Sequence, residues 1–434
     1  MLNRLDLRGL GAAVADRLPR PEIAGDEPRA VVRELVAEVR ADGDAALRRL
    51  TERFDGVTLE SIRVADTELD AAVDELDPEL RAAYDAAIEG IEAFHRHQVR
   101  PTEVIARPGL TITASQRPVT SAGLYVPGGR AEYPSTVLMT AVPARVAGVA
   151  RVALCVPPDR RRGSIAPSVL AAARLAGVDE VYAVGGAQAV AAMAYGTGSI
   201  PAVDVIAGPG NVYVALAKQE VAGDVGIAAA FAGPSEVVVI ADHTARPTYA
   251  AIDLIVQAEH GPDGLAWLVT WDEAVADEVC AAGEELLASA PRAEDVRSTL
   301  RSGGYVAIVD DRAAALAVVN AIAPEHLEIQ TADAEELAAS VDNAGAIFCG
   351  ELSPASVGDY VAGPSHVLPT NGSARFASAL TVGDFCKDHH IVTVDRDGLD
   401  RLGPHVIALA TQEGLAAHAE SIRLRLGDEH GEAG

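Results

Sequence analysis

Aromatic and sulfur-containing side chains are scarce in this sequence of 434 residues. Aromatic residues make up 4% of the chain, which contains 3 methionines and 4 cysteines. The cysteines are far apart and form no Cys-x-x-Cys pair, so neither a zinc ribbon nor a disulfide framework is indicated. We therefore expect free thiols in the reducing cytoplasm and a core filled mainly by Ala, Val and Leu.

Positive charge is also in short supply. The chain has 35 Lys and Arg against 63 Asp and Glu, which gives a formal net charge of −28. Such a field repels a phosphate backbone and argues against a nucleic-acid partner. No run approaches the roughly 18 uninterrupted apolar residues of a membrane-spanning helix, and the first residues carry charges where a signal peptide is apolar. We expect neither membrane insertion nor export.

The apolar pattern predicts an α/β protein of more than one domain. Apolar residues recur at helical spacing over 28–100. From Gly123 onward, short apolar strands alternate with Ala-rich helices, and the pattern starts again at Glu236. This alternation is typical of parallel strands with crossover helices. We expect two α/β units in tandem, preceded by a helical lead-in and followed by a small C-terminal appendage.

Three glycine-rich turns follow predicted strands of the first unit, at 127–129, 185–188 and 208–211. Glycine allows backbone N–H groups to approach a phosphate at a helix N-terminus. None of the turns is a G-x-G-x-x-G or a P-loop, and tight turns between strands and helices use glycine in any case. Taken alone, they leave open both a nucleotide site and a purely structural role.

Gln257 and His260 lie three residues apart on a predicted helix, so their side chains share one face. They form either half of a metal site or an ordinary helical pair, since Gln is an unusual metal ligand. Glu325 and His326 directly follow Pro324. A carboxylate beside an imidazole supplies two bases near physiological pH, as alcohol oxidation requires, although adjacent Glu-His pairs also occur by chance.

Asp359 and His366 are embedded in the Gly- and Pro-rich run 358–369, whose restricted backbone suits a built site. Glu413 and His418 flank the start of the predicted closing helix. These two residues are either site residues or a capping acid and a solvated histidine.

Together and in this order, these segments resemble the histidinol dehydrogenase family over nearly the whole chain. The stretches that carry the resemblance are 40–47 with 54–55, 123–129, 134–139, 184–189, 207–211, 232–236, 257–262, 323–328, 358–370 and 413–418. Two positions depart from the family pattern, at 228–231 and at Ser365, and both could alter the shape of the pocket.

The resemblance implies a role for each candidate residue. It implies one zinc ion per subunit, held by Gln257, His260, Asp359 and His418. Glu325 and His326 become the catalytic pair. The implied contacts with NAD are Tyr125, Gln188 and Asn211, and the implied contacts with substrate are Ser235, His366 and Glu413 together with His326 and the four zinc ligands.

The resemblance also implies a fold of two incomplete Rossmann-like units. The expected domains are an N-terminal helical segment at 1–24, a first Rossmann-like domain at 25–122 plus 237–376 with the catalytic and most metal residues, a second at 123–236 that contacts NAD, and a C-terminal segment at 377–434. That last segment is expected to be exchanged between the subunits of a homodimer with shared active sites.

The implied reaction is the NAD-dependent oxidation of L-histidinol to L-histidine through L-histidinaldehyde, the last steps of histidine biosynthesis. One alternative is a zinc- and NAD-dependent dehydrogenase of the same fold that acts on another small alcohol. Alternatives from other classes are a metal-dependent hydrolase and a nucleotide-sensing protein without turnover. NADH formation from histidinol separates the proposed reaction from the last two.

Overall fold

The computed structural model describes residues 2–19, 26–129, 131–228, 233, 235–259, 261 and 264–427. The chain divides into two compact units. Unit 1 comprises Met1–Gln98 and Val119–Phe385, and unit 2 comprises Val99–Pro118 and Cys386–Gly434. Unit 2 therefore combines two segments that are far apart in the sequence, and its first segment interrupts unit 1.

A five-stranded parallel sheet forms the first half of unit 1. Its strands are β4 (Ser121–Tyr125), β5 (Arg151–Cys155), β6 (Glu180–Tyr182), β7 (Val205–Ala207) and β8 (Gly226–Ile227), in the spatial order β6-β5-β4-β7-β8. The connecting helices are α5 (Pro134–Ala147), α6 (Pro167–Leu175), α7 (Gly186–Tyr195) and α8 (Val212–Val221). Strands β5 and β6 lie on one side of β4, and β7 and β8 lie on the other. The strand order therefore reverses between β4 and β7.

The predicted helical lead-in packs on this first sheet. It consists of α1 (Asp26–Asp42), α2 (Asp44–Asp55), α3 (Asp66–Asp74) and α4 (Pro78–Arg96). Leu47, Leu69 and Ile91 share one apolar core with Leu124 and Val190. The prediction that residues 25–122 form one domain with 237–376 was therefore wrong, because the helices of 26–96 share their core with the first sheet. An apolar stripe shows that a helix must be covered, but it does not identify the sheet that covers it.

A six-stranded parallel sheet forms the second half of unit 1. Its strands are β1 (Asn3–Asp6), β9 (Glu236–Ala241), β10 (Leu265–Thr270), β11 (Gly304–Ile308), β12 (His326–Gln330) and β13 (Ala346–Cys349), in the order β1-β11-β10-β9-β12-β13. The first strand pairs with a strand three hundred residues later, and its neighbour is the 3-10 helix η1 (Gly11–Arg17). The expected helical segment at 1–24 thus begins with a strand, because a four-residue strand has no periodicity to read.

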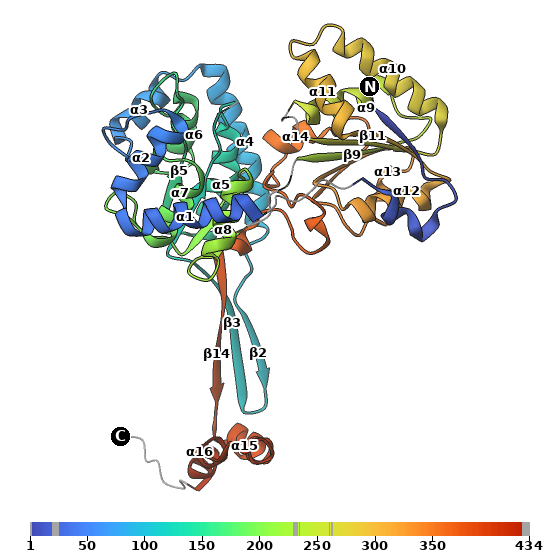
Figure 1. Cartoon of the computed structure of the whole chain (residues 1–434). Helices are drawn as coiled ribbons and strands as arrows, with labels where there is room; N and C mark the ends of the chain where they lie inside the picture. Colours follow the sequence, from blue (N-terminus) through green and yellow to red (C-terminus); the bar gives the residue numbers. More distant parts are fainter. Residues whose placement is uncertain are drawn as a thin grey trace. The chain divides into compact units, whose positions relative to one another are not determined.

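Helices cover both faces of the second sheet (Figure 1). One face packs on α9 (Pro247–Ala258), α10 (Glu273–Leu287) and α11 (Ala293–Gly303). The other face packs on η1, α12 (Arg312–Ile322) and α13 (Ala334–Ala338). The short segments α14 (Ala355–Tyr360), η2 (Ser373–Arg375) and η3 (Val382–Phe385) follow β13. Two helix-covered parallel sheets confirm the predicted α/β class.

Unit 2 is a three-stranded antiparallel sheet followed by two helices. The sheet has the order β14 (Cys386–Val394), β3 (Leu110–Pro118) and β2 (Glu103–Arg107), and the helices are α15 (Arg396–Gln412) and α16 (Ala416–Gly427). The closing helix was predicted, whereas the antiparallel sheet was not. A pairing between strands as far apart in the sequence as β3 and β14 leaves no local signal.

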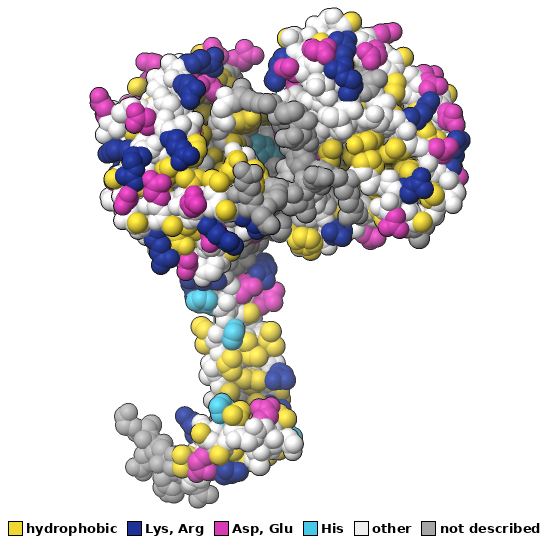
Figure 2. All heavy atoms as spheres, in the orientation of Figure 1, with side chains coloured by type: hydrophobic (Ala, Val, Ile, Leu, Met, Phe, Trp, Pro, Cys, Tyr) yellow, Lys and Arg dark blue, Asp and Glu magenta, His cyan; other side chains and the backbone are white. Residues whose placement is uncertain are grey.

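The sheet of unit 2 exposes apolar side chains on both faces. Ile105, Ile112 and Val392 lie in one cross-strand row, and Val104 and Ile391 flank Thr113 in the next row. Val104, Ile105, Ile391 and Val392 are each at least half exposed, and Figure 2 shows hydrophobic side chains gathered along these strands. An apolar surface of this kind usually marks an interaction site. Within the described residues, no helix is long and apolar enough to cross a membrane.

Candidate active site

The predicted catalytic pair lies at the start of β12, at the N-terminal edge of the six-stranded sheet. Glu325 precedes the strand and His326 is its first residue. The chain enters the strand through Ala323, whose φ of 52° is left-handed, and then through Pro324. Such a backbone is costly for a residue with a Cβ, and strained backbone of this kind clusters at functional sites.

Glu325, His326 and Asp359 come together in the structure. Glu325 Oε2 accepts a hydrogen bond from the backbone N–H of Glu236 at 3.0 Å and lies 3.8 Å from His326 Nδ1. His326 Nε2 lies 3.3 Å from Asp359 Oδ1, on α14. Both Glu325 and His326 are buried. A buried imidazole between two carboxylates is suited to accepting and releasing protons.

The two carboxylates determine the charge state of His326 in this arrangement. Burial by itself lowers the pKa of His326. The negative charge of Glu325 and the hydrogen bond that His326 donates to Asp359 act in the opposite direction and raise the pKa to about 9. The two carboxylates thus favour the imidazolium form, which is the form that His326 reaches when it accepts a proton.

His366 is oriented from both sides. Its Nδ1 lies 2.9 Å from the backbone oxygen of Asp359, and its Nε2 lies 3.1 Å from Thr136 Oγ1 on α5. Ser365 Oγ donates to the backbone oxygen of Met139, also on α5. Hydrogen bonds from the run 358–369 to α5 therefore connect the second half of unit 1 to the first half. The departure at Ser365 keeps a buried hydrogen bond. Of the departure at 228–231, Ala228 is buried and residues 229–231 lie outside the described residues.

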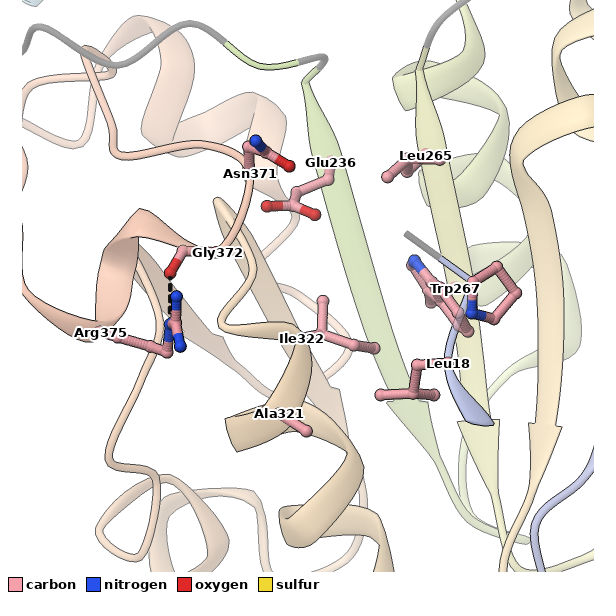
Figure 3. A pocket seen from close by; sticks show the side chains of 10 residues that line it. Leu18, Glu236, Leu265, Trp267, Ala321, Ile322, Asn371, Gly372 and Arg375 are labelled. Atoms are coloured by element: carbon pink, nitrogen blue, oxygen red, sulfur yellow. Dashed lines mark hydrogen bonds between the residues drawn. The ribbon is translucent and has the colours of Figure 1, made fainter. Parts of the chain in front are cut away.

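A second buried acid, Glu236, lies next to Glu325 of the predicted catalytic pair. It begins β9 and lines a cavity of about 50 Å³ together with Trp267, Asn371 and Arg375 (Figure 3). Burial and the negative charge of Glu325 raise the pKa of Glu236 to about 8, against the opposing effect of backbone N–H groups of Gly372 and Asn371. At neutral pH this residue therefore holds a proton close to Glu325.

The predicted zinc ligands are only partly placed. Gln257 is buried in the last turn of α9, and its Nε2 has no hydrogen-bond partner among the described residues. His260 lies outside the described residues, and His418 belongs to unit 2, where it is exposed on α16. Among the described residues, no group of three or more His, Cys, Asp and Glu is close enough to hold a metal.

The described part of the ligand set nevertheless fits a divalent cation. A half-turn of the Gln257 amide exchanges its nitrogen and oxygen, which puts a buried oxygen lone pair at the unpaired position. Asp359 adds a carboxylate oxygen. Two oxygens with two imidazoles would give a mixed N/O set, which suits zinc and other borderline divalent ions.

The remaining predicted substrate contacts are divided between the units. Ser235 directly precedes β9 and is half-buried, and its backbone oxygen accepts from Leu265 N–H. Glu413 belongs to unit 2, where it follows the last residue of α15 and is exposed. Ser235 on unit 1 and Glu413 on unit 2 therefore remain predicted substrate contacts.

The three predicted NAD contacts belong to the C-terminal edge of the five-stranded sheet. Tyr125 ends β4, and its hydroxyl accepts from the backbone N–H of Gly186 at 3.1 Å, two residues before the buried Gln188. Asn211 is the N-cap of α8 and follows the turn at Gly208, which packs against the Tyr125 backbone. A cavity of about 270 Å³ borders the strand ends at Pro127 and Pro157. In open parallel sheets, ligands bind where the strand order reverses, which here is between β4 and β7.

Sequence reasoning missed several buried polar residues around these sites. Lys218 on α8 is fully buried, and its Nζ donates to the backbone oxygen of Gly208, while burial lowers its pKa to about 7. Its spacing from Val214 and Val221 on one helical face could have revealed it, since a lysine there replaces an expected apolar residue. Glu236 and Thr136 had no comparable signal, because each acquires its partners only through long-range packing.

Comparison with known proteins gives a consistent result. The family model described as histidinol dehydrogenase matches residues 18–426. The chain is 50% identical over 399 residues to a histidinol dehydrogenase of Synechococcus sp., covering 91% of this chain and 92% of that protein, and 49% identical over 409 residues to one of Rhizobium meliloti, covering 93% and 94%.

A solved structure is similar over the same length. The crystal structure of histidinol dehydrogenase from Elizabethkingia anophelis superposes with a TM-score of 0.93 at 36% identity and covers 98% of both chains. The similarity therefore extends over both sheets and unit 2 rather than over a single motif.

Proposed function

The chain belongs to the histidinol dehydrogenase family, and from this premise we propose that it oxidises L-histidinol to L-histidine through L-histidinaldehyde. NAD is the proposed hydride acceptor in both steps, so each histidinol and one water yield two NADH. These are the last steps of histidine biosynthesis, and we place them in the cytoplasm. The observation that carries the proposal is the buried Glu325–His326–Asp359 arrangement, with its distances of 3.8 and 3.3 Å.

Glu325 and His326 have separate duties in the proposed mechanism. His326, when neutral, accepts the hydroxyl proton of the alcohol as hydride leaves the carbinol carbon. Glu325 then takes a proton from the water that attacks the aldehyde carbon, which gives the hydrate. His326 accepts a proton again as the hydrate loses the second hydride. Water is therefore needed in the second step only.

Zinc and NAD supply what the side chains lack. When bound, zinc supplies a fixed positive charge that orients the substrate, and NAD supplies the hydride acceptor. Gln257, His260 and Asp359 with His418 would hold the metal. Tyr125, Gln188 and Asn211 would contact NAD, and Ser235, His366 and Glu413 would contact the substrate. The oxygen chemistry of Gln257 and Asp359 supports the metal assignment.

We further propose a homodimer whose subunits exchange unit 2 and share active sites. The apolar side chains exposed on both faces of the β2-β3-β14 sheet support this assembly, because a second copy would cover them. Glu413 and His418 would then serve the site of the partner subunit. The runner-up proposal, a dehydrogenase of this fold for another small alcohol, differs only in the substrate.

A steady-state assay tests the proposed activity. Purified protein, NAD and either histidinol or one of a panel of other small amino alcohols are followed by NADH absorbance. We expect turnover of histidinol with two NADH per substrate, loss of activity after treatment with a strong chelator, and recovery with Zn²⁺ or Mn²⁺. Faster oxidation of another alcohol would favour the runner-up. Full activity in protein shown by elemental analysis to be metal-free would refute the zinc assignment.

A further inference from the structure

One face of β12 carries an unusual row of buried polar side chains. His326, Glu328 and Gln330 alternate along the strand with Leu327 and Ile329, and all five are buried. The two apolar residues join the core on the α12 and α13 side of the sheet. Side chains at every second strand position share a face, so the three polar residues point to the opposite side. Burying them costs free energy unless they are hydrogen-bonded.

Glu328 connects this face to two helices. Its Oε1 accepts from the backbone N–H of Ala355, the first residue of α14, at 2.8 Å. Gln330 Nε2 donates to Asp253 Oδ2 on α9 at 2.8 Å and to Glu328 Oε2 at 3.3 Å. Burial and the hydrogen bond with Asp253 raise the pKa of Glu328, and burial raises the pKa of Asp253. The two carboxyl groups therefore share a proton at neutral pH instead of repelling each other.

The spacing along the three elements relates this layer to the active site. Asp253 precedes Gln257 by four residues on α9, and Ala355 precedes Asp359 by four on α14, which is about 6 Å along a helix in each case. Glu328 follows His326 by two residues on β12, about 6.6 Å along a strand. Helices α9 and α14 run from the C-terminal edge of the sheet toward its N-terminal edge. Asp253 and Glu328 therefore lie about one helical turn farther from the N-terminal edge than Gln257, His326 and Asp359.

We propose that Asp253 and Glu328 are positioning residues for the metal-binding side of the active site. Their shared hydrogen bond ties α9 to β12, and the bond from Ala355 to Glu328 ties α14 to the same strand. Gln257 and Asp359 thereby keep a fixed separation from each other and from His326. Neither acid is a ligand itself. The inference rests on the proposed function, because it takes Gln257 and Asp359 as zinc ligands.

Zinc affinity of the full-length protein tests this role without relying on turnover. Glu328→Met keeps the side-chain length but removes the hydrogen bonds with Ala355, Gln330 and Asp253. We expect the zinc dissociation constant, measured by competition with a chromophoric chelator, to rise about 10- to 100-fold. Glu328→Gln keeps an acceptor for Ala355, gains a donor for Asp253 and loses only the 3.3 Å bond from Gln330, so it should stay within about threefold of wild type. The control Val306→Ala, in the buried core on β11, should lower the melting temperature of the metal-free protein and leave zinc affinity unchanged.

The outcomes separate the positioning role from general stability and from the proposed function. Equal zinc affinity in wild type and Glu328→Met, whatever their melting temperatures, would overturn the positioning role alone. Weak binding by Glu328→Gln comparable to that of Glu328→Met would also overturn it, because the hydrogen bonds would not be the cause. If Glu328→Met does not fold, Asp253→Ala replaces it. This variant leaves the bond from Ala355 to Glu328 intact, and we expect its zinc dissociation constant to rise by about 10- to 100-fold as well. Wild-type protein that binds no zinc would overturn the metal assignment itself and, with it, this proposal.

Discussion

Burial gives chemically identical carboxyl groups of this protein different protonation states. Glu236, at the start of β9, is almost completely buried and faces the charge of Glu325. Exposed glutamates, such as Glu278 on α10, have no such surroundings. A buried acid that holds a proton in the folded state and releases it on unfolding makes stability depend on pH.

We therefore predict that Glu236→Gln reduces the pH dependence of stability. The folded-state pKa of about 8 is above the ordinary value of 4.5. Between these two values the folded protein binds one more proton than the unfolded chain, so stability falls as pH rises, by at most about 1.4 kcal/mol per pH unit from this group. Urea unfolding between about pH 5 and pH 8 should give a shallower slope for the variant. Glu278→Gln should keep the wild-type slope, and parallel curves for all three proteins would contradict the prediction.

A second prediction at this scale concerns the division of labour between Glu325 and His326. Glu325→Gln should slow oxidation of histidinaldehyde much more than oxidation of histidinol, because only the aldehyde step needs an activated water. A general base contributes about 10²- to 10⁴-fold. His326→Asn should slow both steps, since a proton is accepted in each. The measurement is single-turnover NADH formation from each substrate supplied separately, and equal losses in the two steps of Glu325→Gln would reject the assigned role.

At the scale of elements, helix ends position the proposed NAD site. Asn211 is the N-cap of α8, and its side-chain oxygen accepts from the backbone N–H groups of Tyr213 and Val214 at 3.1 and 3.2 Å. Lys218 on the same helix donates to Gly208, so both ends of the turn 208–211 are held by α8. Asn211 therefore has a structural duty besides its predicted contact with NAD.

Substitution of Asn211 separates these two duties. Asn211→Ala removes the cap and should lower the free energy of unfolding by about 1 kcal/mol, whereas Asn211→Ser preserves a capping oxygen and should cost only a few tenths. If the amide also contacts NAD, the KM for NAD should rise in both variants. Urea unfolding and steady-state kinetics measure the two effects. Wild-type stability in Asn211→Ala would show that the cap contributes nothing.

At the scale of the whole molecule, the candidate residues are divided between two units of the chain. Glu325, His326 and Asp359 belong to unit 1, whereas Glu413 and His418 belong to unit 2. The exposed apolar sheet of unit 2 supports exchange of this unit between subunits. If the active site is shared, variants with lesions in different units should complement each other.

We expect two inactive variants to complement each other in a mixed dimer. His326→Asn impairs both steps on the catalytic side, and His418→Asn removes a proposed metal ligand from the exchanged unit. With shared sites, one site of the mixed dimer collects both lesions and the other collects none, so NADH production from histidinol should return after the variants are unfolded and refolded together. Mixed dimers confirmed by mass spectrometry but still as inactive as each parent would show that each subunit completes its own site.

The sequence by itself determined the α/β class, most element positions and the candidate residues of the catalytic pair. Periodicity is local, so it predicts α5, β5 or α9 from a dozen neighbouring residues. The tertiary structure alone decided that β1 joins β11, that 26–96 packs on the first sheet and that 99–118 pairs with 386–394. It also placed Glu236 beside Glu325 and Glu328 beside Asp253. Such partners are far apart in the chain, and they meet only because burying apolar surface brings their elements together.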